Sequence, residues 1–253
     1  MLNVLLAGCN GRMGQVIATL AQGRDDVQIV CGVDTYDGIT NSFPVYPDFQ
    51  NIPFEVDVII DFSHPSVLEG LLTFAVDNSV PCVLCTTGYS EAQILSINEA
   101  AKSVAVFRSG NMSLGINLLI EISKIAAKVF GTDFDIEIVE KHHNKKIDAP
   151  SGTALMIADE IATVTEYTPE YVYDRHSVRK KRDTKEIGIS SVRGGSIVGE
   201  HDVIFAGDNE VLTISHQAQS RNLFAAGAVN AAIFLADKEP GNYDMSDLLR
   251  SKY

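Results

Sequence analysis

A glycine-spaced segment near the amino terminus constrains the fold of this chain more than any other feature. The residues Gly8-Cys9-Asn10-Gly11-Arg12-Met13-Gly14 follow the apolar run Leu2–Ala7, which predicts a buried strand, and precede a helix expected to end at Gln22. Glycines suit a tight turn with positive φ, a backbone that approaches a phosphate and a helix packed on a strand. This order is typical of a dinucleotide site, although a turn without a ligand has the same pattern.

An acidic residue stands where a dinucleotide site needs one. Asp34 ends the second expected strand, Gln28–Val33, about 20 residues after the glycines, where a carboxylate accepts hydrogen bonds from the adenosine ribose. A carboxylate also repels a 2′-phosphate, and Thr35 follows it instead of an arginine. NADH is therefore the expected cofactor, with NADPH possible because Arg12 could reach a 2′-phosphate.

Strand and helix patterns alternate along the first half of the chain. Further strands are expected at Val56–Asp61, Pro81–Cys85 and Val104–Phe107, with helices at Pro65–Asn78 and Glu91–Lys102 between them. Short apolar strands separated by helices form a parallel sheet covered on both faces. The expected fold class is therefore α/β, with a Rossmann-like parallel sheet in the N-terminal domain.

The pattern changes near Asn111, which predicts a second domain of different architecture. Its expected elements are the helix Leu114–Phe130, the strand Phe134–Glu140 with Glu140 on the polar face, the helix Thr153–Ala162, and the strands Glu186–Arg193, Ser196–Phe205 and Glu210–Gln217. Glycine-containing turns predict that the last three strands form a meander, with one face left for a ligand or a partner subunit. The stretch Thr163–Lys185 is expected to be the least ordered. An alanine-rich helix, about Asn222–Ala236, is expected to be buried and to return to the first domain.

Bulk properties exclude several classes of protein. The net charge of −13 argues against a nucleic-acid partner, because phosphate binding requires a basic face. No apolar run reaches the roughly 18–20 residues of a membrane span, and no signal peptide is evident. Cys82 and Cys85 could form a redox pair or half a zinc site, but their apolar surroundings favour a structural role with no metal. A reducing cytoplasm is expected.

Two later turns are expected to join the cofactor site. Cys85-Thr86-Thr87-Gly88 and Ser109-Gly110-Asn111-Met112 each follow a predicted strand. Ligands of open α/β sheets bind at the carboxyl ends of strands, where these turns supply small residues and free amides. Ordinary turns remain the alternative for both.

Basic residues cluster in the segment from Glu140 to Thr153. His142, His143 and Lys146 stand there in an otherwise acidic chain, just before a predicted helix that begins at Ser151-Gly152-Thr153. A solvated basic loop is the usual interpretation of such a run. Here, however, the adjoining helix start is suited to a carboxylate or phosphate. The combination indicates a site for a dianionic small molecule.

At these residues the chain resembles the 4-hydroxy-tetrahydrodipicolinate reductase (dihydrodipicolinate reductase) family of lysine and diaminopimelate biosynthesis. Three segments carry the resemblance over nearly the whole chain: Gly8–Gly14, the motif from Glu140 to Ala154, and the motif from Arg193 to His201. The resemblance implies NAD(P)H-dependent reduction of 4-hydroxy-tetrahydrodipicolinate to tetrahydrodipicolinate. It further implies a C-terminal α+β domain with an open mixed sheet, and a homotetramer in the cytoplasm. The implied domains are 1–112, joined by 221–253, for the dinucleotide, and 113–220 for substrate and oligomerisation.

The resemblance also implies a role for individual residues. His142 would be the acid/base residue and Lys146 the proton donor, while His143, Gly152 and Thr153 would bind substrate. The implied cofactor-binding residues are Gly8, Cys9, Asn10, Gly11, Arg12, Met13, Asp34, Cys85, Thr86, Thr87, Ser109, Gly110, Asn111 and Met112. Two alternatives remain open at this point. One is another NAD-dependent reductase of an amino-acid pathway, such as an aspartate-type dehydrogenase, and the other is a non-catalytic module that senses NADH.

Overall fold

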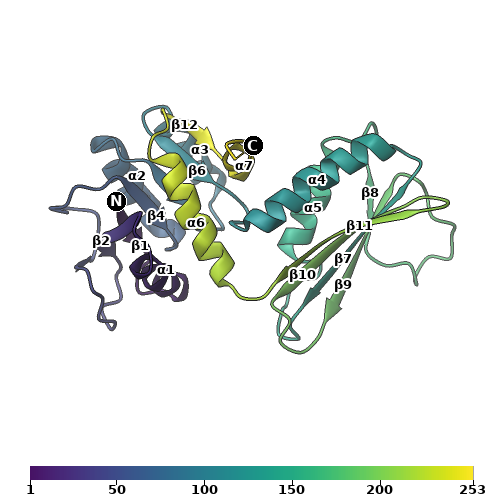
Figure 1. Cartoon of the computed structure of the whole chain (residues 1–253), viewed down its shortest axis with the longest axis horizontal. Coiled ribbons are helices and arrows are strands. Elements are labelled where there is room, and N and C mark those ends of the chain that lie inside the picture. Colours follow the sequence, from purple (N-terminus) through teal and green to yellow (C-terminus); the bar gives the residue numbers. More distant parts are fainter. Residues whose placement is uncertain (253) are drawn as a thin grey trace. The chain divides into compact units, whose positions relative to one another are not determined.

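The chain divides into two structural units. The structure is a computed structural model that describes residues 1–252. One unit combines Met1–Met112 with the chain from Asn222 onward, and the other is Ser113–Arg221 (Figure 1). Among the described residues, no helix is both long and apolar enough to cross a lipid bilayer.

Seven parallel strands form the sheet of the first unit. Their order is β12-β6-β5-β4-β1-β2-β3. Their bounds are β1 Leu2–Ala7, β2 Val27–Val33, β3 Val45–Tyr46, β4 Val58–Asp61, β5 Cys82–Leu84, β6 Ala105–Arg108 and β12 Gly241–Tyr243. The Rossmann-like parallel sheet is thus confirmed. The sequence does not predict β3 and β12, because they are too short to show a pattern of apolar residues.

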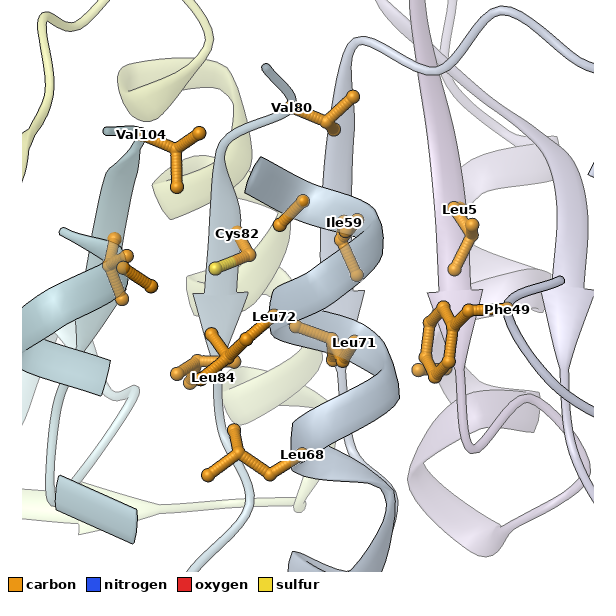
Figure 2. Close-up of a cluster of buried hydrophobic side chains, with 14 of the residues drawn as sticks. Leu5, Phe49, Ile59, Leu68, Leu71, Leu72, Val80, Cys82, Leu84 and Val104 are labelled. Atoms are coloured by element: carbon orange, nitrogen blue, oxygen red, sulfur yellow. The ribbon is translucent and has the colours of Figure 1, made fainter. Parts of the chain in front are cut away.

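Helices cover both faces of this sheet. They are α1 Arg12–Gln22, the 3₁₀ turn η1 Pro65–Val67, α2 Leu68–Asp77, α3 Glu91–Ala100, α6 Asn222–Leu235 and α7 Met245–Arg250. Figure 2 shows Leu68, Leu71 and Leu72 of α2 over the strands β1, β4 and β5. The opposite face holds α6, whose Phe234 ring lies 6.3 Å from that of Phe107. Burial of both faces explains why β1, β4 and β5 are almost entirely apolar, with Asn3 and Asp61 as the exceptions.

A mixed sheet of five strands forms the second unit, in the order β11-β10-β7-β9-β8. The strands are β7 Asp135–His142, β8 Glu170–Val172, β9 Glu186–Arg193, β10 Gly199–Ala206 and β11 Val211–Ala218. The helices α4, Leu114–Phe130, and α5, Gly152–Ala162, pack on one face through buried residues such as Ile138 and Phe205. The open mixed sheet implied by the resemblance is confirmed.

The predicted meander of three strands is wrong. β10 and β11 do form an antiparallel hairpin, but β7 lies between β9 and β10, parallel to the first and antiparallel to the second. The glycines after β9 bind the end of β7 instead of closing a hairpin. The Gly194 amide donates to the His142 carbonyl at 2.9 Å, and the Asn144 amide donates to the Gly195 carbonyl at 3.2 Å.

The position of Glu140 also differs from the expectation. β7 continues to His142, so Glu140 shares the inward face with Ile136 and Ile138 and is fully buried. The sequence pattern instead predicts Glu140 on the polar face together with Glu137. Period-2 alternation places residues 136, 138, 140 and 142 together, and the last two are the polar exceptions on this face.

Ion pairs hold the segment before β9 against the sheet. Arg182 lies 2.7 Å from Asp135, and Arg175 lies 2.6 Å from Glu137 and 2.7 Å from Glu186. The segment also contributes β8. The stretch expected to be the least ordered is therefore tied to β7 and β9 by several of its basic residues.

Candidate functional site

The turn between β1 and α1 is built around close backbone approaches. Gly8 has φ 75°, and a Cβ on Gly14 would lie 2.2 Å from the Gly8 carbonyl oxygen. Gly11 caps α1 without a side-chain hydrogen bond, so the first amides of the helix face the space over the turn. These features fit a dinucleotide, whose pyrophosphate requires bare backbone and helix amides.

A cavity of about 410 Å³ opens beside this turn. It lies where the strand order reverses, at the carboxyl ends of β1, β2 and β4, which is the usual ligand position in such sheets. Four of the predicted cofactor residues line it: Gly8, Asn10, Gly11 and Asp34. Asp34 Oδ2 accepts the Asn10 amide and Oδ1 accepts the Tyr36 amide, both at 2.9 Å, so hydrogen bonds fix the carboxylate in the cavity wall.

Three predicted residues of the glycine turn do not line this cavity. The Cys9 side chain is buried against Gly32, where an added Cβ would lie 2.5 Å from its sulfur. Only the backbone of Cys9 could face a ligand. Met13 is half-buried, and Arg12 is exposed as the first residue of α1.

The two later turns lie at the same edge of the sheet, at the ends of β5 and β6, but they do not line this cavity. The Cys85 amide donates to the Asp61 carbonyl at 2.9 Å. Ser109 Oγ donates to the Asn111 carbonyl at 2.9 Å, and Asn111 and Met112 are buried. The cysteines of the C-x-x-C are free thiols, and burial raises the pKa of both.

One wall of the cavity is formed by residues that the sequence motifs do not predict. Phe62, Ser63 and His64 follow β4 and line the cavity opposite Asp34. The buried Asp61 organises this turn by accepting the Ser63 amide at 3.0 Å, and burial raises its pKa. The signal was available, because the ends of the two strands flanking a switch point face the same ligand.

The predicted chemical residues lie in the second unit, where Glu140 occupies the centre of their cluster. The Nδ1 atom of His142 lies 2.6 Å from Glu140 Oε2. Arg193 donates to both carboxylate oxygens, at 2.7 Å and 2.6 Å, and the Ser151 amide donates to Oε1 at 3.0 Å. Burial alone would raise the pKa of Glu140, but these donors outweigh it and hold the pKa at about 2.

Lys146 extends from the loop that follows His142. Its ammonium group lies 3.0 Å from Asp148 Oδ1, which lowers the pKa of that carboxyl. The Lys146 amide donates to the His143 carbonyl at 3.1 Å, so the loop folds back beside the end of β7. Arg193 also donates to the Asp148 carbonyl at 2.6 Å and so connects this loop to Glu140.

The start of α5 closes the same cluster. Ser151 caps the helix by accepting the Ala154 amide at 3.1 Å, and its Oγ lies 3.2 Å from His201 Nε2. The predicted substrate residues Gly152 and Thr153 are the first two residues of the helix. A Cβ on Gly152 would meet no atom within 4 Å, so there is open space beside this residue.

Two histidines on β10 and β11 complete the row behind Glu140. His201 on β10 lies opposite Glu140 on β7, and on its other side it lies opposite His216 on β11. The three side chains therefore lie side by side on the inward face. The rings of His201 and His142 meet edge to face, with centroids 5.3 Å apart. Burial, assisted by nearby His142, lowers the pKa of His201 to about 4, so it is neutral near pH 7.

The sequence motifs contain Glu140, Arg193 and His201 but predict no role for these three residues, and they predict Ser151 only as part of the helix start. The available signal was an inward-facing acid in an alternating strand, which requires a buried partner. The resulting cluster holds an imidazole on a carboxylate, a lysine ammonium and the start of a helix. Such groups can transfer a proton and bind a carboxylate.

Comparison with known proteins covers nearly the whole chain. Family models described as dihydrodipicolinate reductase, N-terminus and C-terminus, match residues 2–112 and 115–249. A 4-hydroxy-tetrahydrodipicolinate reductase of Caldanaerobacter subterraneus subsp. tengcongensis is 52% identical over 99% of both chains. One of Clostridium tetani is 46% identical, over 99% of this chain and 98% of its own.

Solved structures show the same fold. Dipicolinate-bound dihydrodipicolinate reductase from Paenisporosarcina sp. TG-14 matches with a TM-score of 0.81, at 24% identity, over 96% of this chain and 97% of its own. An aspartate dehydrogenase from Thermotoga maritima matches with a TM-score of 0.53 at 14% identity, over 94% and 98% of the two chains. At such identities the likeness concerns the fold alone.

Proposed function

The chain belongs to the dihydrodipicolinate reductase family, and we propose that it reduces 4-hydroxy-tetrahydrodipicolinate to tetrahydrodipicolinate with NAD(P)H, in lysine and diaminopimelate biosynthesis. Full-length identity of 42–52% to reductases of this name carries the proposal. The cluster of His142, Lys146 and the start of α5 supports it, because the substrate is a dianion that must gain a proton. An aspartate-type dehydrogenase is supported by fold alone, and a sensing module would have no use for this cluster.

The first unit would hold the cofactor. The turn Gly8–Gly11 would receive the pyrophosphate, and Asp34 would bind the adenosine ribose. The turns Cys85–Thr87 and Ser109–Met112 would border the nicotinamide half, since they end neighbouring strands at the same edge. When bound, NAD(P)H supplies the hydride for the reduction.

The second unit would bind the substrate and move protons. The amides of Gly152 and Thr153 would bind one carboxylate, with His143 as a further contact. Lys146 would neutralise charge near the ring nitrogen and donate a proton. His142, anchored through Nδ1, would exchange protons through Nε2 as acid/base residue.

A coupled assay tests the proposed function. Purified dihydrodipicolinate synthase generates the substrate in situ, and absorbance at the reduced nicotinamide band follows the oxidation of NADH or NADPH. We expect cofactor oxidation that depends on the synthase. No oxidation of either cofactor, with a folded protein that binds NADH, would overturn the proposal.

Cofactor preference, assembly and location are finer parts of the proposal. The carboxylate of Asp34 in the cavity wall supports a preference for NADH.

The face of the mixed sheet away from α4 and α5 carries exposed Val192 and Val211, which supports a homotetramer assembled through this face. Free thiols at all four cysteines fit a cytoplasmic location. Light scattering on Val192→Glu and Val211→Glu tests the assembly, because each charge should dissociate the tetramer.

A further inference from the structure

Glu140 is a fully buried carboxylate in contact with His142, and the proposed reaction does not use it directly. The Glu140 side chain has no exposed surface, although an ionised carboxylate away from water costs free energy unless it is paired. Both of its oxygens are occupied. Oε1 accepts from Arg193 and from the Ser151 amide, while Oε2 accepts from Arg193 and faces His142.

This contact determines the proton arrangement on the His142 ring. An ionised carboxylate can only accept hydrogen bonds, so Nδ1 at 2.6 Å from Glu140 must carry the proton. In the neutral ring, Nε2 is then the nitrogen that can take up a proton. Nε2 faces Gly199, where a Cβ would lie only 3.1 Å away, so a glycine at this position keeps that side of the ring accessible.

Arg193 connects the same carboxylate to the second chemical group. Its Nη2 donates to Glu140 Oε1 and to the Asp148 carbonyl, both at 2.6 Å. The Asp148 carboxylate in turn lies 3.0 Å from the Lys146 ammonium. The Arg193 guanidinium therefore connects Glu140, which contacts His142, with Asp148, which contacts Lys146.

We propose that Glu140 and Arg193 are a positioning pair for the reduction. Glu140 fixes the proton on His142 Nδ1, and Arg193 holds Glu140 in place and sets the loop that carries Lys146. This inference rests on the proposed function, because it assumes that His142 and Lys146 act on substrate. A buried ion pair that only stabilises the fold is the alternative.

The variant Glu140→Gln separates the two explanations. The Ser151 amide and Arg193 Nη2 both donate to the Oε1 position, whereas Arg193 Nη1 is the one donor fixed on the Oε2 position, so we expect the amide oxygen of a glutamine at Oε1. Its NH₂ group then faces His142 Nδ1 as a donor. The proton of the neutral ring should consequently move to Nε2. Long-range ¹H–¹⁵N correlation spectra of the ¹⁵N-histidine-labelled full chain, assigned with His142→Gln, report this tautomer without any turnover.

Steady-state kinetics provide the second measurement. For Glu140→Gln we expect kcat to fall at least about 10-fold with KM changed less than about 3-fold, since the variant affects proton transfer rather than substrate binding. The matched control is Glu137→Gln on the same strand. It loses a carboxylate paired with Arg175 on the opposite face and should keep the wild-type tautomer and kcat.

The charge left on Arg193 could unfold Glu140→Gln, so the double variant Glu140→Gln/Arg193→Met removes both charges. A folded double variant with the changed tautomer and low kcat supports the positioning role. Retention of the Nδ1 proton, or a kcat within 2-fold of wild type, in either folded variant overturns it. The proposed function and the role of Glu140 can fail separately. A wild-type protein that is inactive in the coupled assay would refute the function, whereas the His142 tautomer in its spectra would still show whether Glu140 fixes the proton on Nδ1.

Discussion

Gly14 and Gly8 approach each other so closely that a Cβ on Gly14 would lie 2.2 Å from the Gly8 carbonyl oxygen. The atoms in the way are backbone, so no side chain can move aside. We expect Gly14→Ala to displace the start of α1, to raise the Kd for NADH at least about 10-fold and to destabilise the first unit by roughly 1–3 kcal/mol. Fluorescence titration and thermal unfolding measure the two effects.

Gly70→Ala is the matched control for this substitution. Gly70 also lies in a helix of the first unit, but its Cβ would make only an ordinary contact of 3.5 Å with Phe49. We expect unchanged NADH binding and a stability equal to or above wild type, because alanine favours helix by up to about 1 kcal/mol. NADH binding by Gly14→Ala at the wild-type Kd would show that the turn does not hold the cofactor.

His142 and Lys146 lie in the second unit, so their removal should separate turnover from cofactor binding. We expect His142→Ala and Lys146→Ala each to lower kcat roughly 100-fold or more, the usual range for a lost acid/base or electrostatic contribution. The Kd for NADH should stay within 2-fold of wild type. Lys145→Ala, which removes an exposed lysine of the same loop, is the control and should keep wild-type turnover. Near-wild-type kcat in either of the first two variants would remove that residue from the chemistry.

Much of the first unit could be predicted from the sequence, because its strands are buried on both faces. Runs such as Leu2–Ala7 are apolar except for Asn3, and the observed β1 has these bounds. The strands β3 and β12 could not be predicted, since two or three residues show no periodicity. Their place at the two edges of the sheet is a consequence of tertiary packing.

The second unit shows where local patterns fail. Glycines at 194 and 195 are typical of a hairpin, yet here the chain passes the end of β7, a strand about 50 residues earlier in the chain. No local signal contains that pairing. The motif residues of the site could be identified, but their arrangement on three neighbouring strands depends on this register. The contact between Glu140 and Arg193 is therefore evident only in the structure.

The charge on Asp34 should influence the choice of cofactor. Its carboxylate lies in the wall of the cavity at the end of β2, where an adenosine 2′-phosphate would meet a like charge. We expect Asp34→Asn to raise the ratio of kcat/KM for NADPH over NADH roughly 10-fold, or about 1.4 kcal/mol. Asp37→Asn removes an exposed acid three residues further on and should leave the ratio unchanged. An unchanged ratio in Asp34→Asn would mean that this carboxylate does not select the cofactor.

Gly199 should protect access to His142. A Cβ at this position would lie 3.1 Å from Nε2 and would cover the side of the ring that we assign to proton exchange. We expect Gly199→Ala to lower kcat at least about 10-fold while the fold is retained. Gly194→Ala, in the turn that precedes β10, has no atom within 4 Å of its added Cβ and serves as the control. Equal kcat in the two variants would place the reacting proton elsewhere.

The pKa of His201 should make the protein less stable as the pH falls below neutrality. Burial, with a contribution from nearby His142, lowers this pKa from 6.5 to about 4 in the folded protein. Between these values the unfolded chain binds more protons than the folded one, so stability is complete above about pH 6.5 and is lost as the pH falls towards 4. The loss is at most about 3 kcal/mol. Two neighbouring groups also titrate. The pKa of Glu140 is lowered from 4.5 to about 2, so Glu140 affects stability only at lower pH. Burial lowers the pKa of His216 as well, so His216 acts in the same direction as His201.

Denaturant unfolding at pH 7 and pH 5 measures this effect. The difference between the free energies of unfolding at the two pH values should be smaller in His201→Gln than in wild type. His176→Gln, which removes an exposed histidine, should keep the wild-type difference. An equal difference in all three proteins would show that His201 does not titrate in this range.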